Sequence, residues 1–125
     1  MIHLDTSFLI RALVPDSSQD HILRQWIGKH TPLGMSTIAW TEFLCGPVDQ
    51  TQVELATHII PQHVAFVEKD AQEAARLFNA SGRRRGSLID CMIAAVAIDA
   101  GASLATANVE DFRRFEVEGL SMAEN

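Results

Sequence analysis

Short, uniformly apolar runs alternate along this chain with longer segments whose apolar residues recur at helical spacing. The runs predict buried strands at residues 2–5, 33–35, 63–67 and 102–106, and a final edge strand near 115–117. The longer segments predict helices at residues 6–14, 18–29, 37–45, 49–60, 69–79 and 87–100, and a short helix or turn at 109–114. Apolar strands separated by helices are typical of a parallel sheet covered on both faces. We therefore expect an α/β fold, a three-layer α/β/α sandwich around a short-stranded, mainly parallel sheet, in a single domain spanning residues 1–125.

Four acidic residues stand against these apolar runs, namely Asp5, Glu42, Asp90 and Asp111. An ionised carboxylate is costly to bury unless a cation or a hydrogen-bond donor accompanies it. Asp5 ends the first predicted strand, Asp90 begins an apolar helix, and Asn108 follows another strand. Ligand sites in parallel sheets lie at the carboxyl ends of strands, so we expect these polar residues to converge at one edge of the sheet.

Each acid also has an ordinary structural explanation when it is taken alone. Asp5 suits a helix N-cap, and Ser87-Leu88-Ile89-Asp90 matches a capping box. Glu42 could pair with a basic neighbour on an exposed helix, while Asp111 could cap the last turn or pair with Arg113 or Arg114. Carboxylates brought together would repel one another, and Mg²⁺ or Mn²⁺ is the natural partner of several oxygen ligands.

The distribution of positive charge changes the picture given by the net charge. A net charge of −6 argues against non-specific binding of nucleic acid. However, Arg83, Arg84 and Arg85 closely precede Asp90, and two further arginines follow Asp111. These side chains either contact the phosphates of a substrate or form a solvated loop and a basic helix end, and the sequence leaves both interpretations open.

Other kinds of site are disfavoured. The histidines show no spacing typical of zinc sites, and there is no C-x-x-C pair, glycine-rich phosphate loop or G-x-S-x-G elbow. Cys45 and Cys91 lie in apolar, helical stretches, so we expect buried, reduced thiols. No apolar run approaches the length of about 20 residues that spans a bilayer. The N-terminus also lacks a secretory pattern, so we expect a cytoplasmic protein without a membrane partner.

The order of these motifs resembles that of the PIN-domain ribonucleases, and their spacing is most similar to the toxin subunits of VapBC toxin–antitoxin pairs. The resemblance covers nearly the whole chain and is carried by Asp5-Thr6-Ser7, Glu42, Asp90-x-x-Ile93-Ala94-Ala95-x-Ala97 and Thr106-x-Asn108-x-x-Asp111-Phe112. It implies an α/β/α sandwich with an acidic pocket for Mg²⁺ or Mn²⁺. It also implies cleavage of single-stranded or loop RNA of the tRNA or rRNA class, a VapB-type antitoxin that blocks the pocket, and a homodimer.

The resemblance also implies roles for individual residues. Asp5 and Asp90 match the principal metal ligands, and Glu42 matches the third acid. Family members often have Thr-x-Asp where this chain has Thr106-Ala107-Asn108, so the fourth position falls either to Asn108 or to Asp111. The hydroxyls of Thr6, Ser7 and Thr106 would orient the ligands, and Arg83, Arg84 and Arg85 would contact RNA phosphates.

Two alternative functions fit part of this pattern. A phosphoacceptor receiver domain also places acids at strand ends, but it would need an acidic pair after the first strand and a late lysine. Here Asp5 stands alone and no lysine follows Lys69, which disfavours that class. The stronger alternative is a PIN-fold RNA-binding or regulatory module with weak or no cleavage activity, because Asn108 adds no charge.

Overall fold

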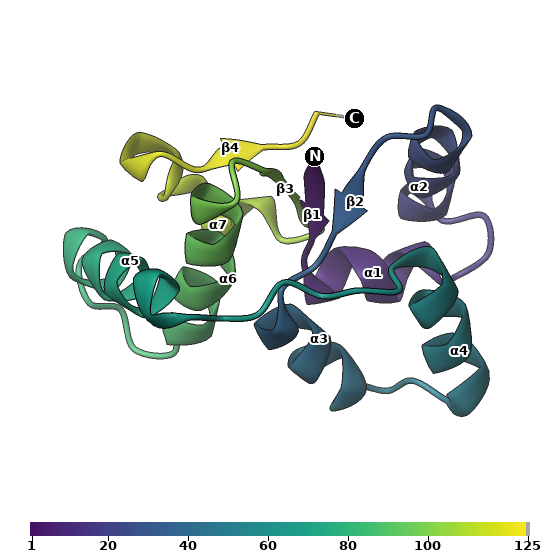
Figure 1. Cartoon of the computed structure of the whole chain (residues 1–125), viewed down its shortest axis with the longest axis horizontal. Coiled ribbons are helices and arrows are strands. Elements are labelled where there is room, and N and C mark those ends of the chain that lie inside the picture. Colours follow the sequence, from purple (N-terminus) through teal and green to yellow (C-terminus); the bar gives the residue numbers. More distant parts are fainter. Residues whose placement is uncertain (125) are drawn as a thin grey trace.

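A short parallel sheet runs through the middle of the protein in a computed structural model that describes residues 1–124 (Figure 1). Within these residues the sheet has four strands, in the order β2-β1-β3-β4, and each neighbouring pair is parallel. The strands are β1 (Ile2–Leu4), β2 (Leu33–Gly34), β3 (Ser103–Ala105) and β4 (Ser121–Met122). All four are very short, so most of the stability of the fold must come from the helices packed on the sheet.

The connections place helices on both faces of the sheet. The chain passes from β1 to β2 through α1 (Thr6–Ala12) and α2 (Ser18–Gly28). It returns across β1 to β3 through α3 (Thr37–Leu44), α4 (Gln50–Ile59), α5 (Glu68–Ala80) and α6 (Leu88–Asp99). Crossovers between parallel strands are right-handed, so connections that run in opposite directions cover opposite faces. Figure 1 shows α5 and α6 to the left of the strands and α2 to the right. α4 belongs to the return connection but lies on the α2 side, where Leu55 and Ile59 line a groove together with residues of α1 and α2. The predicted three-layer α/β/α fold is confirmed.

Two of the predicted strands are wrong. Residues 63–67 form only a single bridge, between Val64 and Ser36, and α5 begins at Glu68 directly after this segment. Residues 116–118 form a 3₁₀ turn after α7 (Val109–Arg113), and the edge strand follows at Ser121–Met122. Phe115 is fully buried and Gly119 has a φ of +115°, so the chain turns there before it joins the sheet. The other elements begin and end within two residues of the prediction.

The buried centre of the molecule is α6, as its almost uniformly apolar sequence predicts. Ala94, Ala95 and Ala97 are completely buried, and these small side chains let the helix pack closely against its neighbours. Cys91 is also buried and free, as expected. The prediction that Cys45 is buried is wrong, because Cys45 is the C-cap residue of α3 and its free thiol is exposed. No helix in residues 1–124 is long and apolar enough to cross a membrane.

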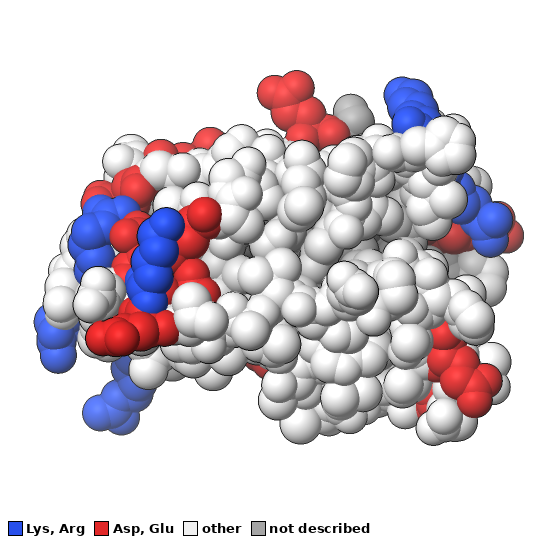
Figure 2. Space-filling model, in the orientation of Figure 1, with Lys and Arg blue, Asp and Glu red and all other residues white. Residues whose placement is uncertain are grey.

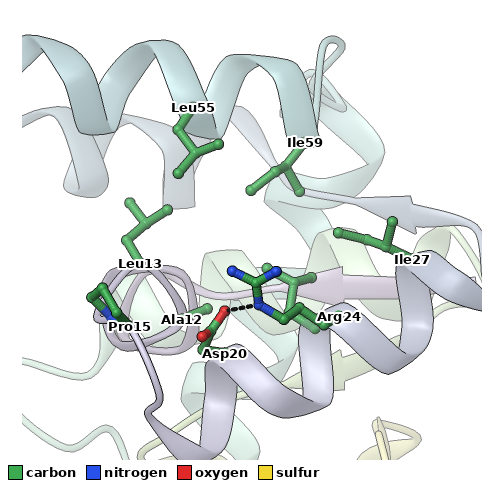
Figure 3. A pocket seen from close by; sticks show the side chains of 9 residues that line it. Ala12, Leu13, Pro15, Asp20, Arg24, Ile27, Leu55 and Ile59 are labelled. Carbon is green, nitrogen blue, oxygen red and sulfur yellow. Dashed lines mark hydrogen bonds and ion pairs between the residues drawn. The ribbon is translucent and has the colours of Figure 1, made fainter.

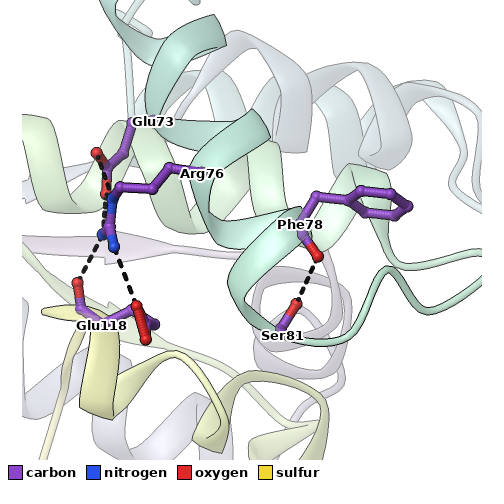
Figure 4. Close-up of polar contacts among 5 residues, drawn as sticks. All are labelled: Glu73, Arg76, Phe78, Ser81 and Glu118. Carbon is purple, nitrogen blue, oxygen red and sulfur yellow. Dashed lines mark hydrogen bonds and ion pairs between the residues drawn. The ribbon is translucent and has the colours of Figure 1, made fainter.

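The C-terminal strand is tied to the helical layer by Arg76 on α5 (Figure 4). Its guanidinium donates hydrogen bonds to the Glu118 carboxylate at 3.0 Å and to the Glu118 carbonyl oxygen at 2.8 Å. Glu73, one turn earlier on α5, also pairs with this guanidinium. Because Glu118 precedes β4 by only three residues, the contact fixes where the edge strand meets the sheet.

Candidate active site

Most of the polar residues predicted for the site meet in one hollow at the carboxyl ends of β1 and β3. The hollow has a volume of about 260 Å³ and is lined by Asp5, Thr6, Ser7, Ile10, Glu42, Asp90, Ile93, Asn108 and Phe112. These residues come from the β1–α1 junction, α3, α6 and the segment that follows β3. The sheet order therefore gathers side chains that lie far apart in the sequence, as predicted.

Asp5 is the most buried acid of the hollow, with 3% of its surface exposed. Its Oδ1 accepts hydrogen bonds from the Phe8 amide and the Ser7 hydroxyl, both at 2.9 Å, and its Oδ2 accepts one from Thr106 Oγ1 at 2.6 Å. Burial raises the pKa of the Asp5 carboxyl, the hydrogen bonds from Thr106, Phe8 and Ser7 oppose this shift, and the charge of Glu42 adds to it. Asp5 is thus an N-cap of α1 and also an acid that faces the hollow.

The hydroxyls of Ser7 and Thr106 join the loop after β1 to the loop after β3. Each hydroxyl has one proton, and each donates it to Asp5. Ser7 Oγ in turn accepts from the amide of Ala107 at 3.1 Å, and Thr106 Oγ1 accepts from the amide of Asn108 at 2.9 Å. These bonds fix the orientation of the Asp5 carboxylate from two separate segments of the chain.

Glu42 reaches the hollow from the exposed side of α3. The hydroxyl of Thr6 lies 3.1 Å from Glu42 Oε1 and 2.9 Å from the carbonyl oxygen of Ala39, so its single proton is shared between two acceptors. In residues 1–124 Glu42 forms no ion pair, so the pairing with a basic neighbour considered above does not occur. Its carboxylate remains available to a ligand in the hollow.

Asp90 lies in the first turn of α6, but the predicted capping box is absent. The Ser87 hydroxyl donates to the carbonyl oxygen of Arg84 at 2.7 Å and makes no capping hydrogen bond to α6. Asp90 is half-buried. Burial and then repulsion from Asp111 raise its pKa to about 6, Arg114 opposes the shift, and the other acids of the hollow add to it. Asp90 therefore carries a negative charge that the described residues leave incompletely compensated.

The fourth position of the site is divided between two residues. Asn108 lines the same hollow as the three acids, whereas Asp111 lines an adjoining hollow of about 380 Å³ together with Asn108. Asp111 forms no ion pair within the part of the chain described here, because Arg113 pairs with Glu110 at 3.2 Å. Asp111 is exposed, yet its charge is the largest electrostatic contribution to the raised pKa of Asp90. Asn108 therefore faces the acids directly, and Asp111 acts on Asp90 from the rim.

The donor set of the hollow fits a hard divalent cation. No three His, Cys, Asp or Glu side chains among residues 1–124 are close enough to hold one ion by themselves. Mg²⁺ usually keeps several water ligands and binds through one or two carboxylates, so it does not require such a cage. The charge of Glu42 contributes to the raised pKa of Asp5, and the charges of Glu42 and Asp5 contribute to the raised pKa of Asp90. This is negative charge of the kind that a divalent ion neutralises.

The arginines at 83–85 lie outside the hollow. Arg83 has a φ of +55°, and its side chain folds back on α5, where it lies 5.2 Å from the Phe78 ring and donates a hydrogen bond to Asn79. Arg84 and Arg85 are exposed. On the face shown in Figure 2, basic side chains are interspersed with acidic ones over α5 and the centre is uncharged. On this face, positive charge is local and forms no continuous basic surface.

Apolar residues of the hollow, such as Ile93 and Phe112, are not among the predicted site residues. Ile93 follows Asp90 by three positions, which places both on one face of α6, and this spacing is a signal that could have found it. Phe112 is 2% exposed and supports the wall beside Asn108. Arg114, which opposes the charge of Asp90, carries no such signal in the sequence.

Comparison with known proteins agrees with this geometry. The sequence model of the PIN domain family matches residues 2–118 of the chain. The chain belongs to the PIN-domain family. This membership confirms the resemblance seen in the sequence and accounts for the short parallel sheet with acids at its carboxyl edge. No curated protein sequence matches the chain significantly.

Solved structures share the fold of this PIN domain over nearly its whole length. A chain of VapBC2 from Rickettsia felis, bound to a promoter DNA fragment, has 23% identity and a TM-score of 0.77, with 98% of each chain covered. A chain of VapBC-1 from nontypeable Haemophilus influenzae has 24% identity and a TM-score of 0.73, covering 99% of this chain and 98% of that one. A chain of a toxin–antitoxin complex from Klebsiella pneumoniae has 22% identity and a TM-score of 0.71, with 90% of each covered.

Proposed function

We propose that this PIN domain is a Mg²⁺- or Mn²⁺-dependent endoribonuclease that cleaves single-stranded or loop RNA, and that it is the toxin of a type II toxin–antitoxin pair. The observation that carries the proposal is the convergence of Asp5, Glu42 and Asp90 in one hollow, where Arg114 offsets only part of the negative charge at Asp90. PIN domains are typically nucleases, and the structural neighbours are VapBC complexes, which supports the same assignment.

In the proposed mechanism, Asp5 and Asp90 would be the principal ligands of the metal ion and Glu42 would be the third. The bound ion would act as a Lewis acid that activates water and neutralises charge on the scissile phosphate. Ser7, Thr106 and the Phe8 amide hold the Asp5 carboxylate in one orientation, so its ligand geometry is set before substrate binds.

Positioning of water in the hollow falls to the residues opposite Asp5. Glu42 accepts a hydrogen bond from the attacking water, and Thr6 limits the positions that the Glu42 carboxylate can adopt. Asn108 can donate to a phosphate oxygen or accept from water, because its side chain faces the three acids and is uncharged. Asp111 strengthens the negative potential at the rim, where it would favour a divalent ion.

Contacts to the RNA backbone are proposed for Arg83, Arg84 and Arg85, which lie three to five residues before the start of α6. Arg84 and Arg85 are exposed and free to bind phosphates, whereas Arg83 must first leave the Phe78 ring. Such contacts give affinity that depends on salt but does not read bases. The tRNA or rRNA class of substrate remains a prediction from the family.

The test compares the purified chain with Asp5→Asn and Asp90→Asn. We expect the wild type to cleave RNA with Mg²⁺ or Mn²⁺ and to stop on addition of EDTA, and both variants to lose cleavage while their circular dichroism is unchanged. Glu54→Gln, an exposed acid on α4, is the control and should retain activity. If the folded wild-type chain binds RNA but shows no metal-dependent cleavage, the protein is instead the PIN-fold RNA-binding module considered as the alternative.

Metal binding can be measured separately from cleavage, by thermal unfolding of the protein. Mg²⁺ should raise the midpoint temperature of the wild type more than that of Asp90→Asn. The pKa of Asp90 in the fold, about 6, lies above its ordinary value, so ionised Asp90 destabilises the metal-free fold as pH rises through that value. Asp90→Asn without metal should therefore be the more stable chain at pH 7.5, and this advantage should shrink below about pH 5.

A groove on the other side of α1 supports the proposed antitoxin partner (Figure 3). It has a volume of about 240 Å³ and is lined by Ala12, Leu13, Pro15, Asp20, Leu23, Arg24, Ile27, Leu55 and Ile59. Leu55 and Ile27 are 50% and 47% exposed, and Arg24 pairs with Asp20 at the groove wall. An amphipathic helix of a VapB-type antitoxin would cover these apolar side chains. Co-purification with a small DNA-binding protein encoded immediately upstream tests this assignment.

Three further expectations belong to the same proposal. A homodimer is expected, and light scattering of the isolated chain measures it. The chain is expected to fold as one domain over residues 1–125, which a single cooperative unfolding transition would support. A cytoplasmic location follows from the role of an RNA-cleaving toxin.

A further inference from the structure

A pair of acids lies at the end of the α5–α6 helix pair that is remote from the hollow of Asp5, Glu42 and Asp90. Asp70 is in the first turn of α5, and Asp99 is the last residue of α6. Both line a hollow of about 340 Å³ together with Val64, Ala65, Val67, Lys69, Val96 and Ala100. Two carboxyl groups thus meet where the N-terminal end of α5 lies beside the C-terminal end of α6.

The surroundings of the two carboxyl groups differ. Asp70 is 4% exposed and its Oδ2 accepts a hydrogen bond from the amide of Val67 at 2.9 Å, so ionised Asp70 has a donor at the start of α5. Asp99 is half-buried, and its Oδ2 is buried without a hydrogen-bond partner among the described residues. A negative charge at the C-terminal end of a helix is also disfavoured by the helix dipole. Asp99 is therefore the member of the pair that is favoured to hold a proton.

The other charged groups that face Asp99 all come from α5. Burial and then the neighbouring Asp70 raise the pKa of Asp99 to about 6, Lys69 opposes the shift, and Glu73 adds a smaller contribution. Glu73 is already paired with Arg76, and the Lys69 side chain is exposed. The remaining lining residues, at 64–67 and on α6, carry no ionisable side chain. No cation in this hollow fully compensates a second ionised carboxylate.

We propose that Asp70 and Asp99 share one proton at weakly acidic pH and act as a clasp that holds the start of α5 against the end of α6, and that the clasp loosens as the pH rises toward neutrality. The proton leaves to bulk solvent, after which the two carboxylates repel each other. The proposal concerns the stability of the helix pair and does not depend on the proposed nuclease activity.

The test measures thermal unfolding of the full chain against pH, without divalent metal. The pKa of Asp99 in the fold lies above its ordinary value, so Asp99 makes the fold less stable as the pH rises from about 4 through 6. Asp99→Asn keeps a hydrogen-bond donor for Asp70 at every pH. We expect this variant to unfold about 3 °C or more above the wild type at pH 7.5 and within about 1 °C of it at pH 4.5. Asp70→Asn keeps an acceptor for the Val67 amide and should show the same pattern.

Two results separate the clasp from simpler effects. The double variant Asp70→Asn/Asp99→Asn should gain no more than either single variant, because each removes the same repulsion. Glu68→Gln, which removes an exposed acid from the same turn of α5, should keep the wild-type pH dependence. The titration of Asp90 does not interfere, since it lies nine residues from Asp99, or about 13 Å along the helix.

Direct titration completes the experiment. Carbon-13 NMR of the side-chain carboxyls should place the midpoint of Asp99 near pH 6 in the wild type and move it toward its ordinary range in Asp70→Asn. An Asp99 midpoint near pH 4 in both proteins, or gains that simply add in the double variant, would overturn the proposal.

Discussion

At Asp5, the fold and the site use the same two carboxylate oxygens. One oxygen accepts a hydrogen bond from the Phe8 amide and so caps the start of α1. The other accepts a hydrogen bond from the hydroxyl of Thr106, in the segment after β3. The N-cap and the acid of the hollow are therefore one arrangement, and the two explanations considered for Asp5 do not compete. The hydrogen bonds also make the ionised form of Asp5 usable despite its burial.

Thr106 is the residue through which this arrangement is best tested. Thr106→Val keeps the shape of the side chain but leaves Asp5 Oδ2 without its donor and the Asn108 amide without its acceptor. We expect RNA cleavage to fall by about 10–100-fold, as for other residues that orient metal ligands. The free energy of unfolding should fall by about 1–3 kcal/mol, measured in urea.

Thr106→Ser is the matched control, because it restores the hydroxyl and should recover most of the cleavage. If Thr106→Val cleaves RNA like the wild type, Asp5 does not need this hydrogen bond for activity.

Single residues also show what local sequence cannot predict. The acids were found because charge beside apolar runs is visible in the sequence, and the hollow gathers Asp5, Glu42 and Asp90 as expected. The capping box failed because Ser87 has helical backbone angles, φ −96° and ψ −2°, whereas an N-cap needs an extended residue. The bond between Thr106 and Asp5 joins residues 101 positions apart, and no local pattern encodes it.

At the scale of elements, the helices were predicted well and the strands less so. The helices have long amphipathic or apolar patterns, whereas strands of two or three residues leave little pattern to detect. Residues 63–67 are as apolar as a strand, but only Val64 forms a bridge, and its partner Ser36 lies beyond the end of β2. At 116–122, packing of Phe115 and the contact of Arg76 with Glu118 decide where the chain turns, and both depend on tertiary structure.

The pairing of β1 with β2 depends on the absence of a side chain at Gly34. Gly34 lies opposite His3 in the register, and a Cβ there would stand 2.9 Å from His3 Cδ2 and 3.0 Å from His3 Nε2. The His3 ring is 2% exposed and has little room to move. We expect Gly34→Ala to lower the free energy of unfolding by about 1–3 kcal/mol, measured in urea.

Gly28→Ala, at the last residue of α2, provides the comparison. A Cβ on Gly28 meets no atom within 4 Å, so this substitution should be neutral or stabilise the fold by about 0.5–1 kcal/mol. Equal effects of the two alanine variants would mean that the contact with His3 is not what requires glycine in β2.

At the scale of the whole molecule, the small number of exposed cations limits how RNA can be held. The net charge is −6, and basic and acidic side chains are mixed over α5 (Figure 2). Under the proposed function, RNA binding would therefore rely on a few local phosphate contacts together with a divalent ion. Arg84 and Arg85 are the residues that we expect to make these contacts.

Salt dependence of RNA binding measures these contacts. In the cleavage-deficient Asp90→Asn chain, Arg84→Ala and Arg85→Ala should each reduce the slope of log affinity against log salt by about 0.7, the value for one contact to single-stranded nucleic acid. Arg83→Ala should change the slope less, because Arg83 stacks on Phe78. Arg24→Ala, on α2, is the control and should leave the slope unchanged. If none of the substitutions at Arg83, Arg84 and Arg85 changes the slope, the RNA binds elsewhere on the protein.

The hydrogen bond between Thr106 and Asp5 also has a consequence during protein synthesis. Asp5 leaves the ribosome early, but its partners on β3 and beyond are made about 100 residues later. At about 5–20 residues per second, about 1–3 s pass between the synthesis of Asp90, the last of the three acids, and that of Thr106, and until then the hollow is incomplete. A nascent or truncated chain that stops before β3 therefore carries Asp5, Glu42 and Asp90 without the geometry of the hollow, so the proposed nuclease activity would arise only when synthesis of the chain is nearly complete.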